Sequence, residues 1–174
     1  GDLISYVTSS YFGTEMNEFK DGYVWTPVQS NSVKPEPINP QKTGDTIMAT
    51  KYRVEVKVGS DYKYNTLTTN ATLAAFNNTE VKLEDYVTPY KIYYTKAYGM
   101  ARGSENLTGA GSIKGSAEYY EASAEGFDQA AWDKIGIKSY VEGGKSYLEF
   151  EFNTPCNQFY AMYYLSSGMF SPVP

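Results

Sequence analysis

Hydrophobic and polar residues alternate along residues 51–59, KYRVEVKVG. The apolar set on one face of an extended chain is Tyr52, Val54, Val56 and Val58, and the charged set on the other face is Lys51, Arg53, Glu55 and Lys57. A period of two predicts a half-buried β-strand that ends at Gly59.

The same alternation returns on both sides of Gly143-Gly144. Residues 135–142 precede the two glycines and residues 145–153 follow them, with an apolar residue at every second position from Leu148 to Phe152. Two glycines between two strands favour a tight turn, because both can take positive φ. The pattern therefore predicts an antiparallel β-hairpin.

Across residues 83–98 the apolar side chains recur every three or four positions. At about 100° per residue they fall within one arc of about 140°. They are Tyr86, Val87, Tyr90, Tyr93, Tyr94, Ala97 and Tyr98. This stripe predicts an amphipathic helix, which Pro89 is expected to bend. Because all four tyrosines of residues 90–98 lie on the stripe, we interpret them as core residues, not as an exposed aromatic platform.

A further helix is predicted for residues 155–165, because Thr154 is a good cap and Pro155 would take the first helical position. Helical composition also resumes over residues 116–132. Residues 23–28 are expected to be extended, and residues 3–12 to form a short helix or strand.

Two segments are predicted to be irregular. Residues 30–44 contain three of the chain's eight prolines and read as a connector. Residues 99–116 contain five glycines without periodicity. A loop of this length inside a compact domain is usually functional or mobile.

The composition narrows the function classes. A chain of 174 residues with 41% hydrophobic residues is long enough for one full domain. Its net charge of −5 argues against a nucleic-acid partner, since no basic field neutralises phosphates. The sequence has no histidine, which removes the commonest general base and zinc ligand. The single cysteine, Cys156, is expected to be a buried, inert thiol.

Carboxylates are the remaining candidates for catalysis. Glu149 and Glu151 share the outward face of a predicted strand, about 7 Å apart, which invites comparison with a glycosidase pair. We interpret them instead as strand charges opposite lysine or arginine neighbours. The sequence carries no nucleotide-binding or calcium-loop motif. We therefore expect no enzyme activity, no cofactor and no metal.

The order of four segments along the chain is similar to that in one known protein family. In sequence they are TKYRVEVKVGSDYKYNT, FNNTEVKLEDYVTPYKIYYTK, SIKGSAEYYEAS, and WDKIGIKSYVEGGKSYLEFEFNTPCNQFYAMYYLSSGMFSPVP. Over about residues 46–174 this series resembles the extracellular solute-binding proteins of peptide-type ABC importers, the oligopeptide and dipeptide binders. Lys82-Leu83 and Gly143-Gly144 depart from the family's usual residues at their positions.

The resemblance implies an α+β fold, with an antiparallel sheet and packed helices, that forms the outer subdomain of a periplasmic-binding-protein-like lobe. Residues 1–45 would be a strip of the first lobe's core subdomain plus a connector, and residues 46–174 the outer subdomain. The function implied is peptide transport: this piece would help to capture a peptide or another small solute.

The implied partners are the second lobe of the same protein and the membrane permease of the importer. The resemblance further implies an extracellular lipoprotein that is associated with the cell envelope through a lipid anchor outside this chain, and that is a monomer. In the family, a loop of the outer subdomain reaches toward the cleft between the lobes. The corresponding ligand-binding candidates here are Ser104, Glu105, Asn106 and Leu107.

A second function class stays open at this point. Tyrosine-rich surfaces also suit a non-catalytic carbohydrate-binding or adhesion module. Such a module needs two or three exposed, coplanar rings, so burial of the tyrosines in residues 90–98 would distinguish the two classes.

Overall fold

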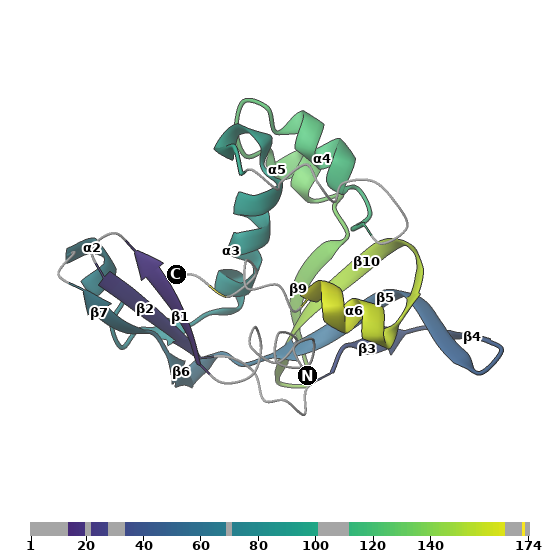
Figure 1. The fold of residues 1–174 in the computed structure, drawn as a ribbon, viewed down its shortest axis with the longest axis horizontal. Helices are drawn as coiled ribbons and strands as arrows, with labels where there is room; N and C mark the ends of the chain where they lie inside the picture. The colour runs from purple at the N-terminus through teal and green to yellow at the C-terminus, as the bar shows by residue number, and fades with distance from the viewer. Residues whose placement is uncertain are drawn as a thin grey trace.

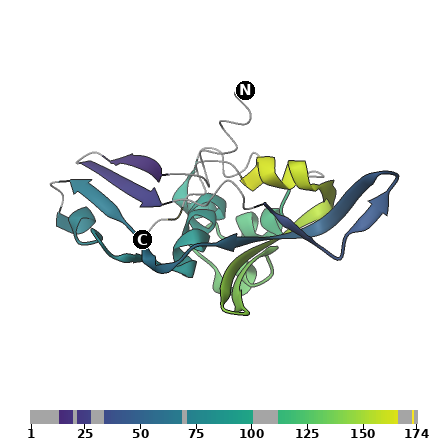
Figure 2. The ribbon, with the colours of Figure 1, turned by 90° about the horizontal axis from the view of Figure 1, so that it is seen from below.

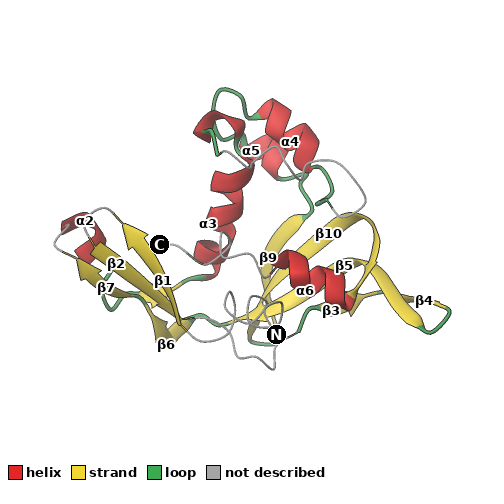
Figure 3. Ribbon diagram, viewed as in Figure 1, coloured by secondary structure: helices red, strands yellow, loops and turns green. Residues whose placement is uncertain are grey.

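A computed structural model describes residues 14–19, 22–27, 34–68, 71–100, 112–165 and 172. These residues form an α+β fold of antiparallel sheets and helices (Figures 1 and 3). The strands are β1 (Thr14–Phe19), β2 (Gly22–Pro27), β3 (Glu36–Ile38), β4 (Gln41–Thr43), β5 (Thr46–Val56), β6 (Gly59–Lys63), β7 (Asn65–Thr68), β8 (Glu80–Val81), β9 (Ile137–Glu142) and β10 (Lys145–Asn157). The helices are α2 (Ala71–Ala74), α3 (Leu83–Tyr94), the 3-10 turn η1 (Lys96–Tyr98), α4 (Ser116–Ala122), α5 (Gln129–Trp132) and α6 (Gln158–Leu165).

The main sheet has the order β3-β5-β10-β9, and β4 also pairs with β5. Every pairing in it is antiparallel. Tyr52, Val54 and Val56 of β5 are buried, as their alternation predicts. The strand ends at Val56 and not at Gly59, because Val58 is only partly buried and Gly59 begins β6. Figure 2 shows β4 and the start of β5 extending as a two-stranded arm away from the other elements.

The predicted hairpin is confirmed as β9 and β10. Lys145 pairs with Glu142, and the register continues without a slip to the pair of Phe150 with Ile137. Gly143 and Gly144 form the turn with φ of 58° and 77°. Positive φ at both positions is the requirement that favours glycine in a two-residue turn.

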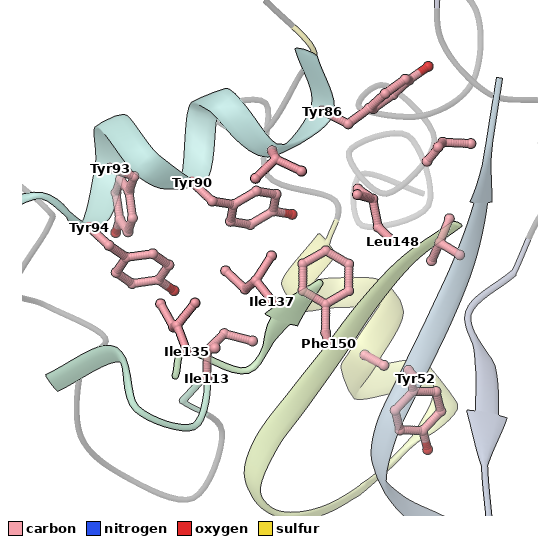
Figure 4. Close-up of a cluster of buried hydrophobic side chains, with 14 of the residues drawn as sticks. Tyr52, Tyr86, Tyr90, Tyr93, Tyr94, Ile113, Ile135, Ile137, Leu148 and Phe150 are labelled. Atoms are coloured by element: carbon pink, nitrogen blue, oxygen red, sulfur yellow. The ribbon is translucent and has the colours of Figure 1, made fainter. Parts of the chain in front are cut away.

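Helix α3 packs on the sheet through its tyrosines, and α4 and α5 lie beside it (Figure 1). Tyr90 and Tyr94 have no exposed surface, and Tyr93 is 3% exposed. The Tyr90 ring points toward Ile137 and Phe150, and its centroid lies 5.3 Å from that of Phe150 (Figure 4). The interpretation of these three tyrosines as core residues is confirmed.

The fourth tyrosine of that stretch corrects the prediction. Tyr98 is 52% exposed, not buried. The α-helix ends at Tyr94, and Thr95 takes extended angles (φ −77°, ψ 112°) before η1 begins. This break rotates the chain, so a residue four positions after Tyr94 no longer lies on the buried stripe.

Two further expectations are wrong. The segment 30–44 is not a continuous loop, because β3 and β4 lie within it and pair with β5. The last helix begins at Gln158, not at Pro155, because β10 pairs with β5 again at Cys156 and Asn157 after an irregularity. The Asn157 side chain then accepts a hydrogen bond from the backbone N–H of Tyr160, which caps the helix.

A second sheet has the order β1-β2-β7. It confirms extended structure for residues 23–27 within β2. Its third strand, β7, follows the main-sheet strand β5 in the chain, so strand pairing connects segments on both sides of residue 45. The short element predicted for residues 3–12 lies outside the described residues.

Candidate functional site

The predicted ligand-binding residues Ser104, Glu105, Asn106 and Leu107 lie outside the described residues, but both ends of their loop are described. At one end, Gly99 takes a left-handed conformation (φ 64°) and its N–H donates to the carbonyl of Lys96. At the other end, the carbonyl of Ser112 accepts from the N–H of Asn153, 2.9 Å away. The second end is therefore attached to β10 of the main sheet.

The first end is fixed to α4 by buried hydrogen bonds. The hydroxyls of Thr95 and Tyr119 lie 2.6 Å apart. At the end of α4, the hydroxyl of Ser123 accepts a hydrogen bond from the N–H of Lys96, and the carbonyl of Ser123 accepts one from the N–H of Ala97. Because α4 packs in turn on α3 and α5, the loop departs from and returns to one packed frame.

A groove of about 590 Å³ lies between α3, α5 and β9. Its lining residues are Glu84, Val87, Lys91, Gln129, Trp132, Asp133, Ile137, Lys138 and Ser139. The floor is apolar and the rim carries two lysines and two carboxylates. Such a groove can take an apolar side chain while charged groups hold its polar neighbours.

Most of the charged groups at the groove already have partners. Lys91 forms an ion pair with Glu84, and its ammonium lies over the rings of Phe127 and Trp132, 5.4 Å and 5.8 Å from their centroids. Asp133 accepts a hydrogen bond from a side-chain amide of α5. Within the part of the chain that the structure describes, Lys138 has no ion pair. It stands opposite Glu149 in the β9–β10 register, so its side chain projects from the outer face of the sheet, opposite to the face that carries Ile137 and Ser139.

A second hollow, of about 350 Å³, lies at the base of the β4–β5 arm. Its lining residues are Asn39, Gln41, Thr43, Met48, Ala49, Thr50 and Pro155. All of them are uncharged, so this hollow offers hydrogen bonds but no acid or base. The neighbouring Cys156 is buried, as predicted, and burial raises the pKa of its thiol to about 11. A thiol with that pKa is protonated near neutral pH and is a poor nucleophile.

The carboxylates considered for catalysis lie on the outer face of the main sheet. Glu149 and Glu151 each lie 4.0 Å from the ammonium of Lys51. Glu151 also pairs with Lys114 at 2.8 Å, and Glu149 accepts from the hydroxyl of Tyr140. They are the lysine-paired strand charges that the sequence predicts.

A larger network on this face was not predicted. Arg53 donates to Glu36 at 2.8 Å and to Glu142 at 2.6 Å, and its guanidinium lies 4.4 Å from the ring centroid of Tyr147. The hydrogen bond to Glu36, followed by that to Glu142, raises the pKa of Arg53. The sequence places Arg53 on the outward face, but only the strand order shows which carboxylates it reaches.

One buried carboxylate organises the start of α3. Asp85 accepts from the hydroxyl of Tyr64 and from the backbone N–H of Lys82, both at 2.9 Å. Burial, and then the hydrogen bond to Asp85, raises the pKa of Tyr64. Through the bond from the backbone N–H of Lys82, the carboxylate forms one half of a capping box with Lys82, the residue that precedes the helix. An aspartate at the third helical position is the sequence signal that could have shown it.

The described residues contain no group of three or more histidine, cysteine, aspartate or glutamate side chains that could hold a metal ion. Among the same residues no helix is long and apolar enough to cross a membrane. No family model, curated protein or solved structure matches this chain.

Proposed function

We propose that this chain is a ligand-capture domain of a solute-binding protein that serves a peptide-type ABC importer. The observation that carries the proposal is that the segments of the resemblance pack around one core. Strand β5, helix α3 and the β9–β10 hairpin all contribute to it. In this proposal the chain performs no covalent chemistry, and the tyrosines of α3 serve stability.

The capture surface in this proposal is the loop between Gly99 and Ser112. Glu105 would pair with the amino terminus of a peptide, since a charge-assisted hydrogen bond is stronger than a neutral one. Leu107 would contact an apolar side chain, and Ser104 and Asn106 would meet the peptide backbone. The described ends of the loop support this role, because both are held by a packed frame that a closing second lobe could press against.

The second lobe and the membrane permease complete the proposed system. In this proposal the protein is extracellular and a lipid anchor holds it at the cell envelope. The ligand would be enclosed between the lobes, where its backbone polar groups are hydrogen-bonded away from water. Burial of Tyr90, Tyr93 and Tyr94 favours this proposal over a carbohydrate-binding module, because α3 presents no platform of exposed rings.

Calorimetry of the 174-residue chain with a mixed peptide library tests whether tight peptide binding requires both lobes. A micromolar peptide complex is worth about 8 kcal/mol, and half of that corresponds to millimolar affinity. We expect the isolated chain to bind at millimolar concentration or more weakly, and the two-lobed protein to bind at micromolar concentration. Micromolar binding by the isolated chain would contradict the proposal.

Alanine replacement in the two-lobed protein tests the site. Glu105→Ala is expected to weaken binding of the best peptide by about tenfold or more, as for a lost charged hydrogen bond. Leu107→Ala should lower affinity for peptides with a large apolar side chain. Glu118→Ala, an exposed position on α4, is the matched control and should change nothing. If neither loop variant changes affinity, the loop is a spacer and the site assignment is wrong.

A further inference from the structure

Strand β9 has one open edge. It pairs with β10 on one side, and among the described residues no strand pairs with its other side. Figure 2 shows the β9–β10 hairpin projecting from the rest of the fold. An open strand edge presents a row of N–H and C=O groups that can pair with another strand.

The turn determines which backbone groups face the open edge. A two-residue turn makes Glu142 and Lys145 a hydrogen-bonded pair, and such pairs alternate with non-hydrogen-bonded ones along an antiparallel ladder. Lys138 and Tyr140 therefore direct their backbone groups toward β10. Ser139 and Val141 direct theirs outward, so they are available to a further strand.

The side chains along this edge are complementary to themselves. If a second β9 lies antiparallel with Tyr140 opposite Tyr140, Lys138 of each copy faces Glu142 of the other. These are non-hydrogen-bonded pairs, in which opposed side chains lie closest. Among the described residues Lys138 has no ion pair. Glu142 is an exposed carboxylate, and its ion pair within the same residues is with Arg53.

The same register matches an apolar side chain to the groove. Val141 is 65% exposed and lies on the face of the sheet that carries the core, two residues beyond Ser139. In the pairing about Tyr140, Val141 of the second copy stands opposite Ser139. Ser139 lines the groove, and so do Val87 and Trp132. Val141 of the second copy would therefore be buried against an apolar surface.

From this pattern we propose that two copies of the chain pair through β9 and join their main sheets into one continuous antiparallel sheet. Two Ser139–Val141 backbone pairs, two Lys138–Glu142 ion pairs and two valines over the grooves hold the contact. The inference does not rest on the proposed transport function, and it departs from the monomer that the resemblance implies. The contact is small beside the interfaces of permanent dimers, so the dimer is expected to be weak and concentration-dependent.

Sedimentation equilibrium of the full 174-residue chain, from about 10 µM to about 1 mM, is the test. The average mass should rise above the monomer's 19.4 kDa as concentration increases. Lys138→Glu alone and Glu142→Lys alone should each weaken association by about tenfold or more, because two attractive pairs become repulsive. The double variant, and an equimolar mixture of the two single variants, should restore it.

Two variants at Ser139 test whether the backbone of the strand edge makes the contact. Ser139→Pro removes an N–H that β9–β10 pairing does not use, and edge strands tolerate proline in such positions. It should abolish association with little change in Tm, whereas Ser139→Ala should associate normally. A chain that stays monomeric at 1 mM overturns the proposal and identifies the edge charges as protection against pairing. Association that survives both Lys138→Glu and Ser139→Pro also overturns it, because another surface would then carry the contact. If Ser139→Pro unfolds the chain, the charge-exchange variants decide.

Discussion

Replacing Tyr90 with alanine removes a fully buried ring at the contact between α3 and the main sheet. A buried aromatic side chain removes about 150–250 Å² of surface from water. At about 25 cal/mol per Å² this corresponds to roughly 4–6 kcal/mol. The methyl group of alanine keeps part of that burial, and the cavity collapses in part. We therefore expect the free energy of unfolding to fall by about 3–5 kcal/mol, the range of large aromatic truncations.

Urea denaturation followed by far-UV circular dichroism measures this loss. Tyr98→Ala is the matched control: the same side chain is removed eight residues away, where it is 52% exposed, and the expected change is within about 0.5 kcal/mol. Tyr90→Phe separates the hydroxyl from the ring and is expected to cost much less than the alanine variant. Equal effects of Tyr90→Ala and Tyr98→Ala would refute the placement of α3 on the sheet.

The partner ring provides a second check on the same reasoning. Tyr90 and Phe150 have ring centroids 5.3 Å apart at an interplanar angle of 55°. A double-mutant cycle with Tyr90→Leu and Phe150→Leu should give a coupling of about 0.5–1.5 kcal/mol, as for other aromatic pairs. Additive effects of the two replacements would show that the rings do not touch.

Three further replacements test other parts of the fold. Gly136→Ala places a Cβ 2.6 Å from a backbone carbonyl oxygen of β10 and should lower the free energy of unfolding in urea by about 1–3 kcal/mol or more. Gly143→Asn, at a turn position with open space, should change it by less than about 1 kcal/mol. A larger loss for Gly143→Asn than for Gly136→Ala would contradict the close packing of Gly136 against β10. Asp85→Ala leaves the buried Tyr64 hydroxyl without its acceptor and should cost about 1–3 kcal/mol, part of which Tyr64→Phe should recover. Burial raises the pKa of the Cys156 thiol from 9.0 to about 11. The unfolded chain therefore loses the thiol proton at a lower pH than the folded chain does. The free energy of unfolding that this difference contributes is fully present below pH 9 and is lost as pH rises toward 11. The slope between pH 9 and 10 should include up to about 1.4 kcal/mol per pH unit from this thiol, and Cys156→Ala should remove that part; an unchanged slope would show that the thiol is not buried.

Much of the secondary structure could be predicted from the sequence because it rests on local patterns. The alternation from Tyr52 to Val56 can bury one face only as a strand, and the Gly143-Gly144 turn can close only a hairpin of its two flanking segments. The stripe from Tyr86 to Tyr94 has the period of a helix and is buried as one. These patterns depend on φ/ψ preferences and on side-chain spacing, which a chain carries before it folds.

Contacts between distant segments decided the rest. The break at Thr95 that exposes Tyr98 is fixed by hydrogen bonds to α4, more than twenty residues away. Strands β3 and β4 form where a proline-rich segment meets β5, and β10 extends through Pro155 because β5 is there to pair with it.

The candidate surfaces also depend on contacts between segments that are distant in the sequence. The groove beside β9 exists only because residues of α3, α5 and β9 come together in space. The link from Arg53 to Glu142 requires the strand order β5-β10-β9. The sequence determined the elements and the faces they bury, because periodicity is local. Only the tertiary structure decided which charges and edges meet, because their free energy depends on distances between segments that the chain order leaves open.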